Sequence, residues 1–135
     1  MKSLAKRKKK SPRQRVVKRL DTITSLYIRL RDEYCVVCGS SQNLTNGHLF
    51  SRVSYSTRWD VTEDGNCHCQ CWGCNFSHEH DSYPFTNWYI KKFSYDKWEE
   101  LHRRYKKPKK YTTPQLEDLY NEIKDKHDEL KKQIR

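Results

Sequence analysis

Two cysteine pairs are the residues of this chain whose types and spacing could do chemistry. Cys35 and Cys38 form one C-x-x-C motif, and Cys71 and Cys74 form a second. Each such turn directs two sulfur atoms toward one point, and two turns together supply the four ligands that tetrahedral Zn²⁺ requires. The sequence therefore predicts a structural zinc site made by these four cysteines.

Two further cysteines, Cys67 and Cys69, lie just before the second pair. On an extended strand they share a face with Cys71, while the polar residues between them face the opposite way. Cysteine behaves as a small apolar residue when it is buried. We therefore expect Cys67 and Cys69 to be buried rather than to bind the metal, although competition with Cys71 for zinc stays open at this stage.

The reduced, metal-bound state is favoured over a disulfide framework by the sequence around the N-terminus. The basic segment there is followed neither by an apolar stretch nor by a small-residue cleavage site, so no secretory signal is expected. No apolar run has the length of a membrane-spanning helix. These observations predict an intracellular, reducing location, without a membrane partner.

Length and composition limit the size of the hydrophobic core. The chain has 135 residues, of which 34% are hydrophobic and 33% are charged. A chain of this length corresponds to one domain, and with so few apolar residues it can bury only a modest core. A metal that links distant segments is therefore useful for stability.

Positive charge is concentrated at the N-terminus. Ten of the 28 lysine and arginine residues lie within residues 1–20, which contain no acidic residue, and the remainder is balanced at 18 basic and 17 acidic. A flexible polycation binds a phosphate backbone with salt-sensitive affinity, so residues 1–19 are predicted to be a flexible tail that contacts DNA; a merely solubilising leader is the alternative. The candidate DNA-binding residues are Lys8, Lys9, Lys10 and Arg13 in the tail, with Arg52 and Arg58 as phosphate clamps.

Periodicity and turn residues predict the elements that position the cysteines. Helices are expected over 20–32, from Cys71 onward, over 85–93 and 96–106, and for about 20 residues from Thr113-Pro114; strands are expected over 44–50 and 66–70. Residues 20–106 would form the zinc-stabilised domain, and residues 107–135 a linker and a last helix. The heptad spacing of Leu116, Ile123 and Leu130 predicts packing either on the chain's own domain or on a partner helix in a homodimer.

A longer ordered pattern carries a resemblance to a known family. It comprises Gly47-His48, Ser51-Arg52, Arg58-Trp59-Asp60 and Asn66-x-His68-x-Gln70-Cys71-x-x-Cys74-Asn75. The order of cysteines, histidine and asparagines resembles that of the His-Asn-Asn variant of the HNH superfamily, as in phage endonuclease VII. The full pattern, over about residues 20–105, resembles the NinG (Rap) recombination proteins of lambdoid phages.

The resemblance implies a fold and a function. The fold would be α+β, with a small zinc-stapled ββα-metal core (HNH or His-Me finger, treble-clef-like) flanked by N-terminal and C-terminal helices. The function would be that of a structure-specific endonuclease that cleaves branched DNA, such as Holliday junctions, in the bacterial host cytoplasm. No small-molecule substrate is expected. A non-catalytic, zinc-dependent protein that binds branched DNA and an RNA-binding zinc knuckle are the alternatives.

The same resemblance implies roles for single residues. His48, whose ordinary pKa is near 6.5, would take a proton from water, and Asn66 would orient it through hydrogen bonds to backbone. Asn75 would anchor a catalytic Mg²⁺ or Mn²⁺ through its side-chain oxygen. Alternatively, His48 binds the cation and a second group such as His68 activates water.

One position departs from the superfamily pattern. Many HNH enzymes have an acidic metal ligand immediately before the histidine, but this chain has Gly47 there. If residues 74–81 are helical, Glu79 and His78 lie four and three residues after Asn75, on the same helix face. We therefore expect Glu79 or His78 to be the further ligand of the catalytic cation, with a polar loop over these residues as the alternative.

Overall fold

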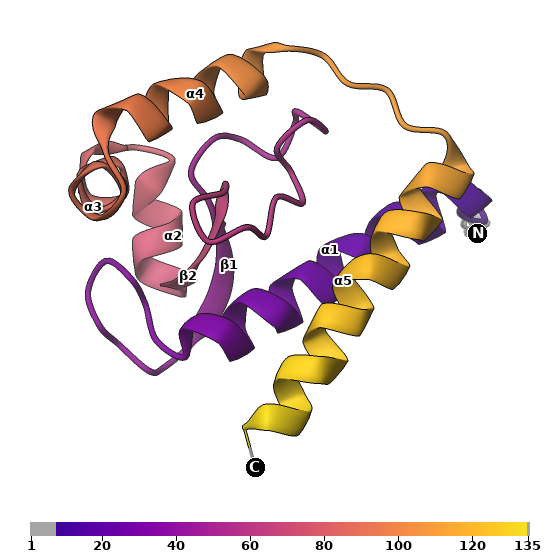
Figure 1. The fold of residues 1–135 in the computed structure, drawn as a ribbon, viewed down its shortest axis with the longest axis horizontal. Coiled ribbons are helices and arrows are strands. Elements are labelled where there is room, and N and C mark those ends of the chain that lie inside the picture. The colour runs from indigo at the N-terminus through magenta and orange to yellow at the C-terminus, as the bar shows by residue number, and fades with distance from the viewer. Residues whose placement is uncertain (1–7, 135) are drawn as a thin grey trace, which may run out of the picture.

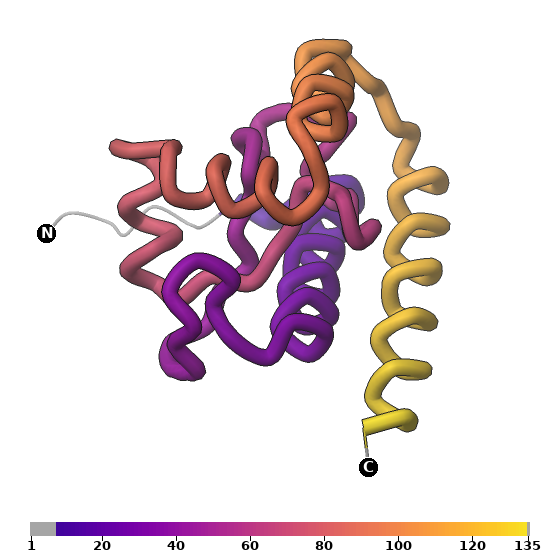
Figure 2. The backbone as a smooth tube through the Cα atoms, turned by 60° about the vertical axis from the view of Figure 1, so that its left-hand side comes forward, coloured from indigo at the N-terminus to yellow at the C-terminus, as the bar shows by residue number. Residues whose placement is uncertain are grey.

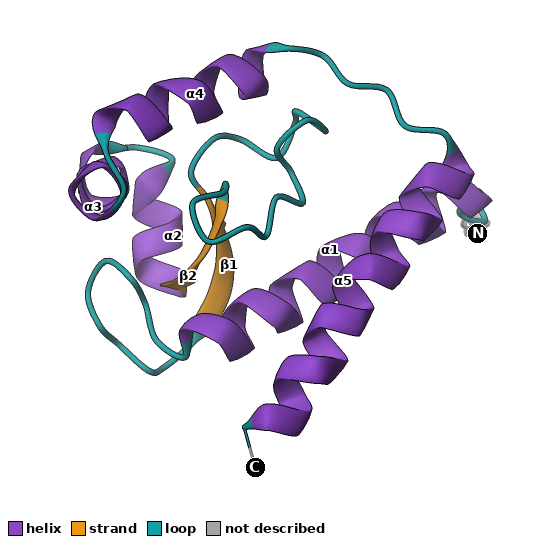
Figure 3. Ribbon diagram, in the orientation of Figure 1, coloured by secondary structure: helices purple, strands orange, loops and turns teal. Residues whose placement is uncertain are grey.

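The chain folds into helices arranged around a two-stranded sheet, in a computed structural model that describes residues 8–134 (Figure 1). The elements are α1 (Pro12–Asp32), β1 (Leu44–His48), β2 (Cys67–Cys71), α2 (Trp72–His78), α3 (Tyr83–Lys92), α4 (Tyr95–Lys106) and α5 (Thr113–Gln133). Figure 3 shows that the strands form a small ribbon and that helices and loops make up the rest. This mixed architecture agrees with the α+β class predicted from the sequence.

The ribbon is antiparallel, and both of its faces are covered. Its register runs from Leu44 opposite Cys71 to His48 opposite Cys67. Cys67 and Cys69 belong to a core cluster that includes residues of α1, so this face of the ribbon lies against α1. Because side chains alternate along a strand, Gly47 belongs to the other face, where α2 packs. The predicted strands are confirmed, with ends shifted by one or two residues.

Helix α1 begins earlier than the sequence analysis predicted. It starts at Pro12 instead of residue 20, because Ser11 and Gln14 form a reciprocal capping box around this proline. Val16 and Leu20 continue the apolar face and are buried, at 2% and 0% exposure. Residues 12–19 are therefore helical, and the prediction of a flexible tail is wrong for them. Residues 1–7 of that tail lie outside the described part of the chain.

Helix α5 packs along α1, as the two views in Figures 1 and 2 show. Leu116 and Ile123, two of the heptad residues, are buried in the same cluster as Leu20 of α1. The predicted last helix is confirmed, although its N-cap is Thr112, whose side chain accepts a hydrogen bond from the backbone of Gln115. The apolar stripe of α5 thus stabilises the chain's own fold.

A second core cluster lies between the loop after β1 and helices α3 and α4. Its buried members are Leu49, Phe85, Tyr89 and Leu101, with Val36, Val37, Phe50, Trp88, Phe93 and Trp98 packed against them. The aromatic side chains of α3 and α4 in this cluster therefore serve as core. None of the helices in the described part of the chain combines the length and apolarity that a membrane span requires.

Removing the side chain of Ile123 tests the contribution of the α1–α5 contact. Ile123 is 1% exposed, so Ile123→Ala leaves a cavity and should lower the free energy of unfolding by about 2–5 kcal/mol. Ile134→Ala is the matched control, because Ile134 is 48% exposed on the same chain segment and should change stability by less than about 0.5 kcal/mol. Urea denaturation of the two variants measures the difference; equal midpoints would contradict the packing role of α5.

Candidate functional site

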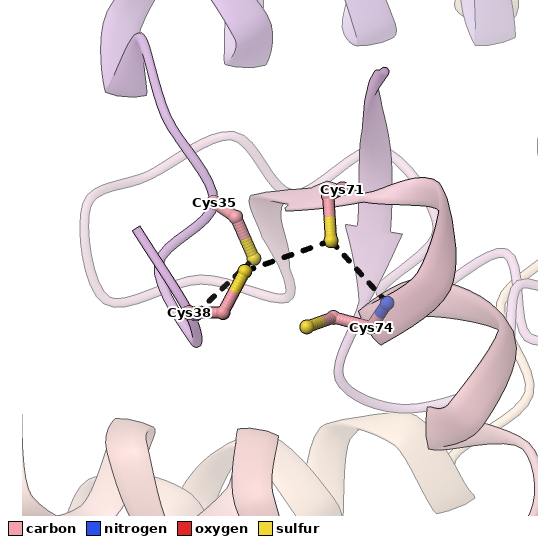
Figure 4. A group of neighbouring side chains, drawn as sticks. All are labelled: Cys35, Cys38, Cys71 and Cys74. Carbon is pink, nitrogen blue, oxygen red and sulfur yellow. Dashed lines mark hydrogen bonds between the residues drawn. The ribbon is translucent and has the colours of Figure 1, made fainter. Parts of the chain in front are cut away.

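The two cysteine pairs meet in space. The sulfur atoms of Cys35, Cys38, Cys71 and Cys74 all lie within 4.8 Å of one another, and their side chains point toward a common centre (Figure 4). The Sγ atoms of Cys38 and Cys71 are 3.7 Å apart. A tetrahedral site with Zn–S bonds of about 2.3 Å has sulfur–sulfur edges of about 3.8 Å. The four cysteines therefore form a cluster that could hold a metal such as zinc.

Local backbone structure positions these sulfur atoms. In the first turn the amide of Cys38 donates to Cys35 Sγ at 3.5 Å, and Gly39, with φ of +81°, closes the turn by donating to the Cys35 carbonyl. In the second, Cys71 ends β2 and caps α2, accepting a hydrogen bond from the amide of Cys74 at 3.4 Å. Amide donors to sulfur favour the thiolate form that a metal requires.

The remaining cysteines are outside this cluster. Cys67 and Cys69 are both 0% exposed, and Cys67 Sγ donates to the carbonyl of Arg58 at 3.3 Å. Burial raises the pKa of each thiol to about 12. They are therefore protonated at neutral pH, and the prediction that they serve as small buried residues is confirmed.

His48 ends strand β1 with one ring nitrogen held in place. Its Nε2 lies 3.0 Å from the carbonyl oxygen of Arg58, and because a carbonyl only accepts, Nε2 carries the proton. The lone pair is then on Nδ1, which has no hydrogen-bond partner among residues 8–134. Burial lowers the pKa of His48 to about 4. The imidazole is thus neutral at pH 7 with its lone pair on Nδ1, and its lowered pKa makes it a weaker base than an ordinary histidine.

Asn66 fixes the chain immediately after His48. Its side-chain amide donates to the carbonyl of Phe50 at 2.9 Å, and its Oδ1 accepts from the amide of Phe50 at 2.7 Å. The backbone of Leu49 donates to the Asn66 carbonyl at 2.9 Å. Asn66 is 0% exposed. It therefore holds the segment that follows His48 through backbone hydrogen bonds, which is the geometry expected of an orienting residue.

His68 is a buried structural residue. It is 2% exposed, and its ring packs edge-on against the aromatic rings of Phe85 and Trp88. Nε2 donates to the carbonyl of Gly65 at 2.6 Å, and Nδ1 faces a guanidinium nitrogen of Arg31 at 3.4 Å. Both ring nitrogens are thus engaged within the fold. The alternative in which His68 activates water is therefore wrong.

Helix α2 directs two polar side chains at strand β1. The amide of Asn75 donates to Thr45 Oγ1 at 3.0 Å, and Asn75 Oδ1 has no partner among the described residues. His78 Nε2 lies 2.9 Å from the carbonyl of Leu49 and donates to it. Glu79, the other expected cation ligand, is exposed and lies one residue beyond the end of α2. Asn75 and His78 thus face the ribbon together.

His48 and Asn75 approach the ribbon from opposite sides. His48 shares the α1 face with Cys67, since both side chains contact the Arg58 carbonyl. Asn75 contacts Thr45 on the face that α2 covers. Strand alternation separates these two faces. A substrate that contacts both side chains would therefore have to lie across the end of the ribbon, where β1 ends.

The two arginines expected to clamp phosphate differ in their surroundings. The guanidinium of Arg58 makes two hydrogen bonds to Asp21, from Nε at 3.0 Å and from Nη2 at 2.6 Å, and lies over the ring of Trp59. Arg52 is exposed, and its charge helps to lower the pKa of His48, after the larger effect of burial. Arg52 is thus free to contact an anion near His48, whereas Arg58 is held by α1.

The basic residues at the start of α1 form part of a groove. Lys10, Arg13, Lys18, Asp21 and Tyr55 line it together with Gln14 and Val17, and its volume is about 440 Å³. Arg13 also donates to the carbonyl of Tyr111 at 2.7 Å, which ties α1 to the segment before α5. Lys8 and Lys9 are exposed nearby in sequence. The groove shares Asp21 with the ion pair that holds Arg58.

Two residues of the site were not singled out from the sequence. Asp21 accepts hydrogen bonds from Arg58 and from Trp59 Nε1, at 2.8 Å for the latter. The sequence around an isolated acidic residue on a helix does not indicate which distant residues it will bind. Gln70 is buried beneath α2, at 1% exposure. Its position between Cys69 and Cys71 on an alternating strand indicated the face but not the burial.

Fold and site together define a mixed helical protein with a two-stranded ribbon and a four-cysteine cluster that could hold a metal. The family described as Bacteriophage Lambda NinG protein matches residues 1–133. The chain therefore belongs to the NinG family. Comparison with curated proteins and with solved structures gave no match.

Metal analysis of cysteine variants tests the four-sulfur cluster. The intact protein, purified in reducing buffer, should contain one tightly bound zinc per chain. Cys38→Ser removes an exposed ligand of the cluster and should lose the metal and lower the melting temperature, because a structural metal contributes directly to folding. Cys67→Ala is the control and should keep its metal. Retention of zinc by Cys38→Ser, or its loss from Cys67→Ala, would contradict the assigned ligands.

The pH dependence of stability tests the burial of His68. Its pKa falls from 6.5 to about 4 on folding because of burial, so the unfolded chain binds the extra proton between these values. The free energy of unfolding should therefore decrease as pH falls from 6.5 toward 4, by up to about 3 kcal/mol from this residue. His68→Gln should show a shallower decrease in denaturant titrations. If the free energy of unfolding depended on pH equally in the intact protein and in His68→Gln, the predicted contribution of His68 would be contradicted.

Proposed function

We propose that this chain is a structure-specific endonuclease that cleaves branched DNA, such as Holliday junctions, by metal-assisted phosphodiester hydrolysis. In this proposal β1, β2 and α2 form the ββα-metal unit of the HNH superfamily, and the four cysteines bind a structural Zn²⁺. The observation that carries it is the geometry of His48, whose Nε2–H is fixed by the Arg58 carbonyl and whose Nδ1 has no partner among residues 8–134. Membership of the NinG family supports the choice of branched DNA as substrate.

His48 would act as the general base. The Arg58 carbonyl holds its Nε2–H at 3.0 Å, so Nδ1 is the atom that takes the proton from the attacking water. General-base catalysis by a positioned side chain contributes about 10²–10⁴-fold to a rate. The bonds from Asn66 to Phe50 keep the segment after His48 in one conformation. The exposed Arg52 would contact the phosphate whose negative charge increases during the reaction.

The chain also offers ligands for a catalytic divalent cation. Among residues 8–134, Asn75 Oδ1 accepts no hydrogen bond while its amide nitrogen donates to Thr45, and His78 Nδ1 is buried without a partner while its Nε2–H donates to a carbonyl. A metal-binding histidine commonly has this arrangement, with the second nitrogen donating to backbone. A bound Mg²⁺ or Mn²⁺ would neutralise charge on the phosphate and the leaving oxygen. Glu79, exposed beyond α2, is the candidate carboxylate of this segment.

The path of the DNA would follow the positive charge of α1. The groove containing Lys10, Arg13 and Lys18 shares Asp21 with the ion pair of Arg58, whose carbonyl in turn holds His48. Phosphate groups in the groove would therefore lead toward His48, with Lys8 and Lys9 adding contacts. A homodimer would place two such sites on the two equivalent strands of a junction.

Replacing His48 tests the proposed reaction. His48→Ala removes the base and should lower the cleavage rate of a four-way junction with Mg²⁺ or Mn²⁺ by at least about 10²-fold. His80→Ala is the matched control, because His80 is exposed beyond α2, and it should cleave normally. A fork, a linear duplex and EDTA complete the assay, and zinc content with circular dichroism confirms that each variant is folded.

Two results would contradict the proposal in different ways. If His48→Ala cleaved at the rate of the intact protein, a residue other than His48 would have to be the general base. Tight binding of the junction without cleavage in any cation would favour the alternative function, a zinc-dependent DNA-binding accessory protein.

A further inference from the structure

Gln70 is a buried polar side chain without a partner. It lies on β2 opposite Thr45, whose hydroxyl donates to the Gln70 backbone carbonyl at 2.8 Å. The side-chain carboxamide itself makes no hydrogen bond within residues 8–134, and its Oε1 is buried. Turning the amide over would only exchange one unpartnered atom for the other. A buried acceptor without a partner costs about 1–3 kcal/mol, so this side chain is not explained by folding.

Gly47 is what allows Gln70 to occupy this position. A Cβ atom added at Gly47 would lie 2.1 Å from Gln70 Oε1 and 2.8 Å from its Cδ, far inside any contact distance. Any side chain at position 47 would therefore displace the carboxamide. The oxygen of Gln70 fills the space in which a residue at position 47 would begin its own side chain.

His78 presents a second unpartnered acceptor to the same region. Its Nε2–H is used by the carbonyl of Leu49, so its buried Nδ1 carries a lone pair with no donor to accept from. Gln70 and His78 both line one groove of about 360 Å³, with the exposed carboxylate of Asp81 also at its edge. Two acceptors cannot satisfy each other. A donor or a cation in this groove would be able to satisfy them.

We propose that Gln70 is a ligand of the divalent cation of the proposed reaction and supplies, with His78, the coordination that no residue at position 47 provides. This inference rests on the proposed function for the role of the cation, but not for its binding. The amide oxygen of Gln70 is a ligand type that suits Mn²⁺, and the imidazole nitrogen of His78 would be the second donor. The thiolate cluster of Cys71 and Cys74 has four sulfur ligands of its own and does not need these atoms.

The test is Mn²⁺ binding to the zinc-loaded full chain, followed by electron paramagnetic resonance of the free ion, with and without an uncleavable phosphorothioate junction. Gln70→Met keeps the approximate shape but removes the oxygen, and should weaken Mn²⁺ binding by at least about tenfold. Gln70→Glu places a carboxylate at the same point and should bind Mn²⁺ more tightly than the intact protein, with a larger rise in melting temperature when Mn²⁺ is added.

A pair of glycine variants gives an independent test. Gly47→Ala should weaken Mn²⁺ binding because its Cβ displaces Gln70, whereas Gly73→Ala, whose Cβ meets no atom within 4 Å, should bind Mn²⁺ normally. Zinc content and circular dichroism show that each variant is folded. Because Gln70→Met and Gln70→Glu are predicted to change affinity in opposite directions, a general loss of stability cannot reproduce the expected pattern.

The outcomes separate this inference from the proposed function. Equal Mn²⁺ affinity in the intact protein, Gln70→Met and Gln70→Glu overturns the inference, even if the protein cleaves junctions. Absence of Mn²⁺ binding in both conditions also overturns it and leaves water as the partner of the two acceptors. Conversely, Mn²⁺ binding that depends on Gln70, in a protein that never cleaves DNA, supports the cation site and contradicts the nuclease.

Discussion

The register of β2 against β1 is the constraint on which the rest of the structure depends. Side chains of β2 alternate, so Cys67 and Cys69 enter the core beside α1 while His68 and Gln70 face the helices on the other side. A slip of one residue would exchange the two sets and bury neither correctly. The cysteine cluster opposes such a slip, because Cys71 at the end of β2 has to meet the turn of the first pair.

The position of His48 depends on α1 through a chain of contacts. Asp21 of α1 holds the guanidinium of Arg58 and the indole of Trp59, and the carbonyl of Arg58 then fixes His48. Helix α5 covers α1 and stabilises it, since Leu116 and Ile123 are buried in the shared cluster. The helices outside the ribbon therefore determine which nitrogen of His48 carries its proton. In a chain with so modest a core, this support gives a physical reason for the long α1.

Local signals in the sequence predicted most elements, and tertiary contacts decided the rest. The C-x-x-C turns and the Thr-Pro start of α5 act over a few residues, so the cysteine cluster and the last helix could be predicted. The start of α1 was not predicted, because the many lysine and arginine residues before residue 20 obscure the periodicity of the buried Val16 and Leu20. The burial of His68 and Gln70 and the partner of Asp21 depend on residues far away in sequence. Strand alternation indicated their faces without indicating what would cover them.

Some buried polar atoms of this chain have no hydrogen-bond partner, and packing alone does not account for them. Of the six buried side-chain atoms without a partner in the described residues, two belong to Gln70 and His78, where α2 packs on the ribbon. Apolar side chains of similar volume at such positions are often neutral for stability or improve it. Packing of α2 on the ribbon therefore does not require these groups. The proposed cation would give a physical reason for their presence, and the fit of Gln70 over Gly47 would make that reason specific to this position.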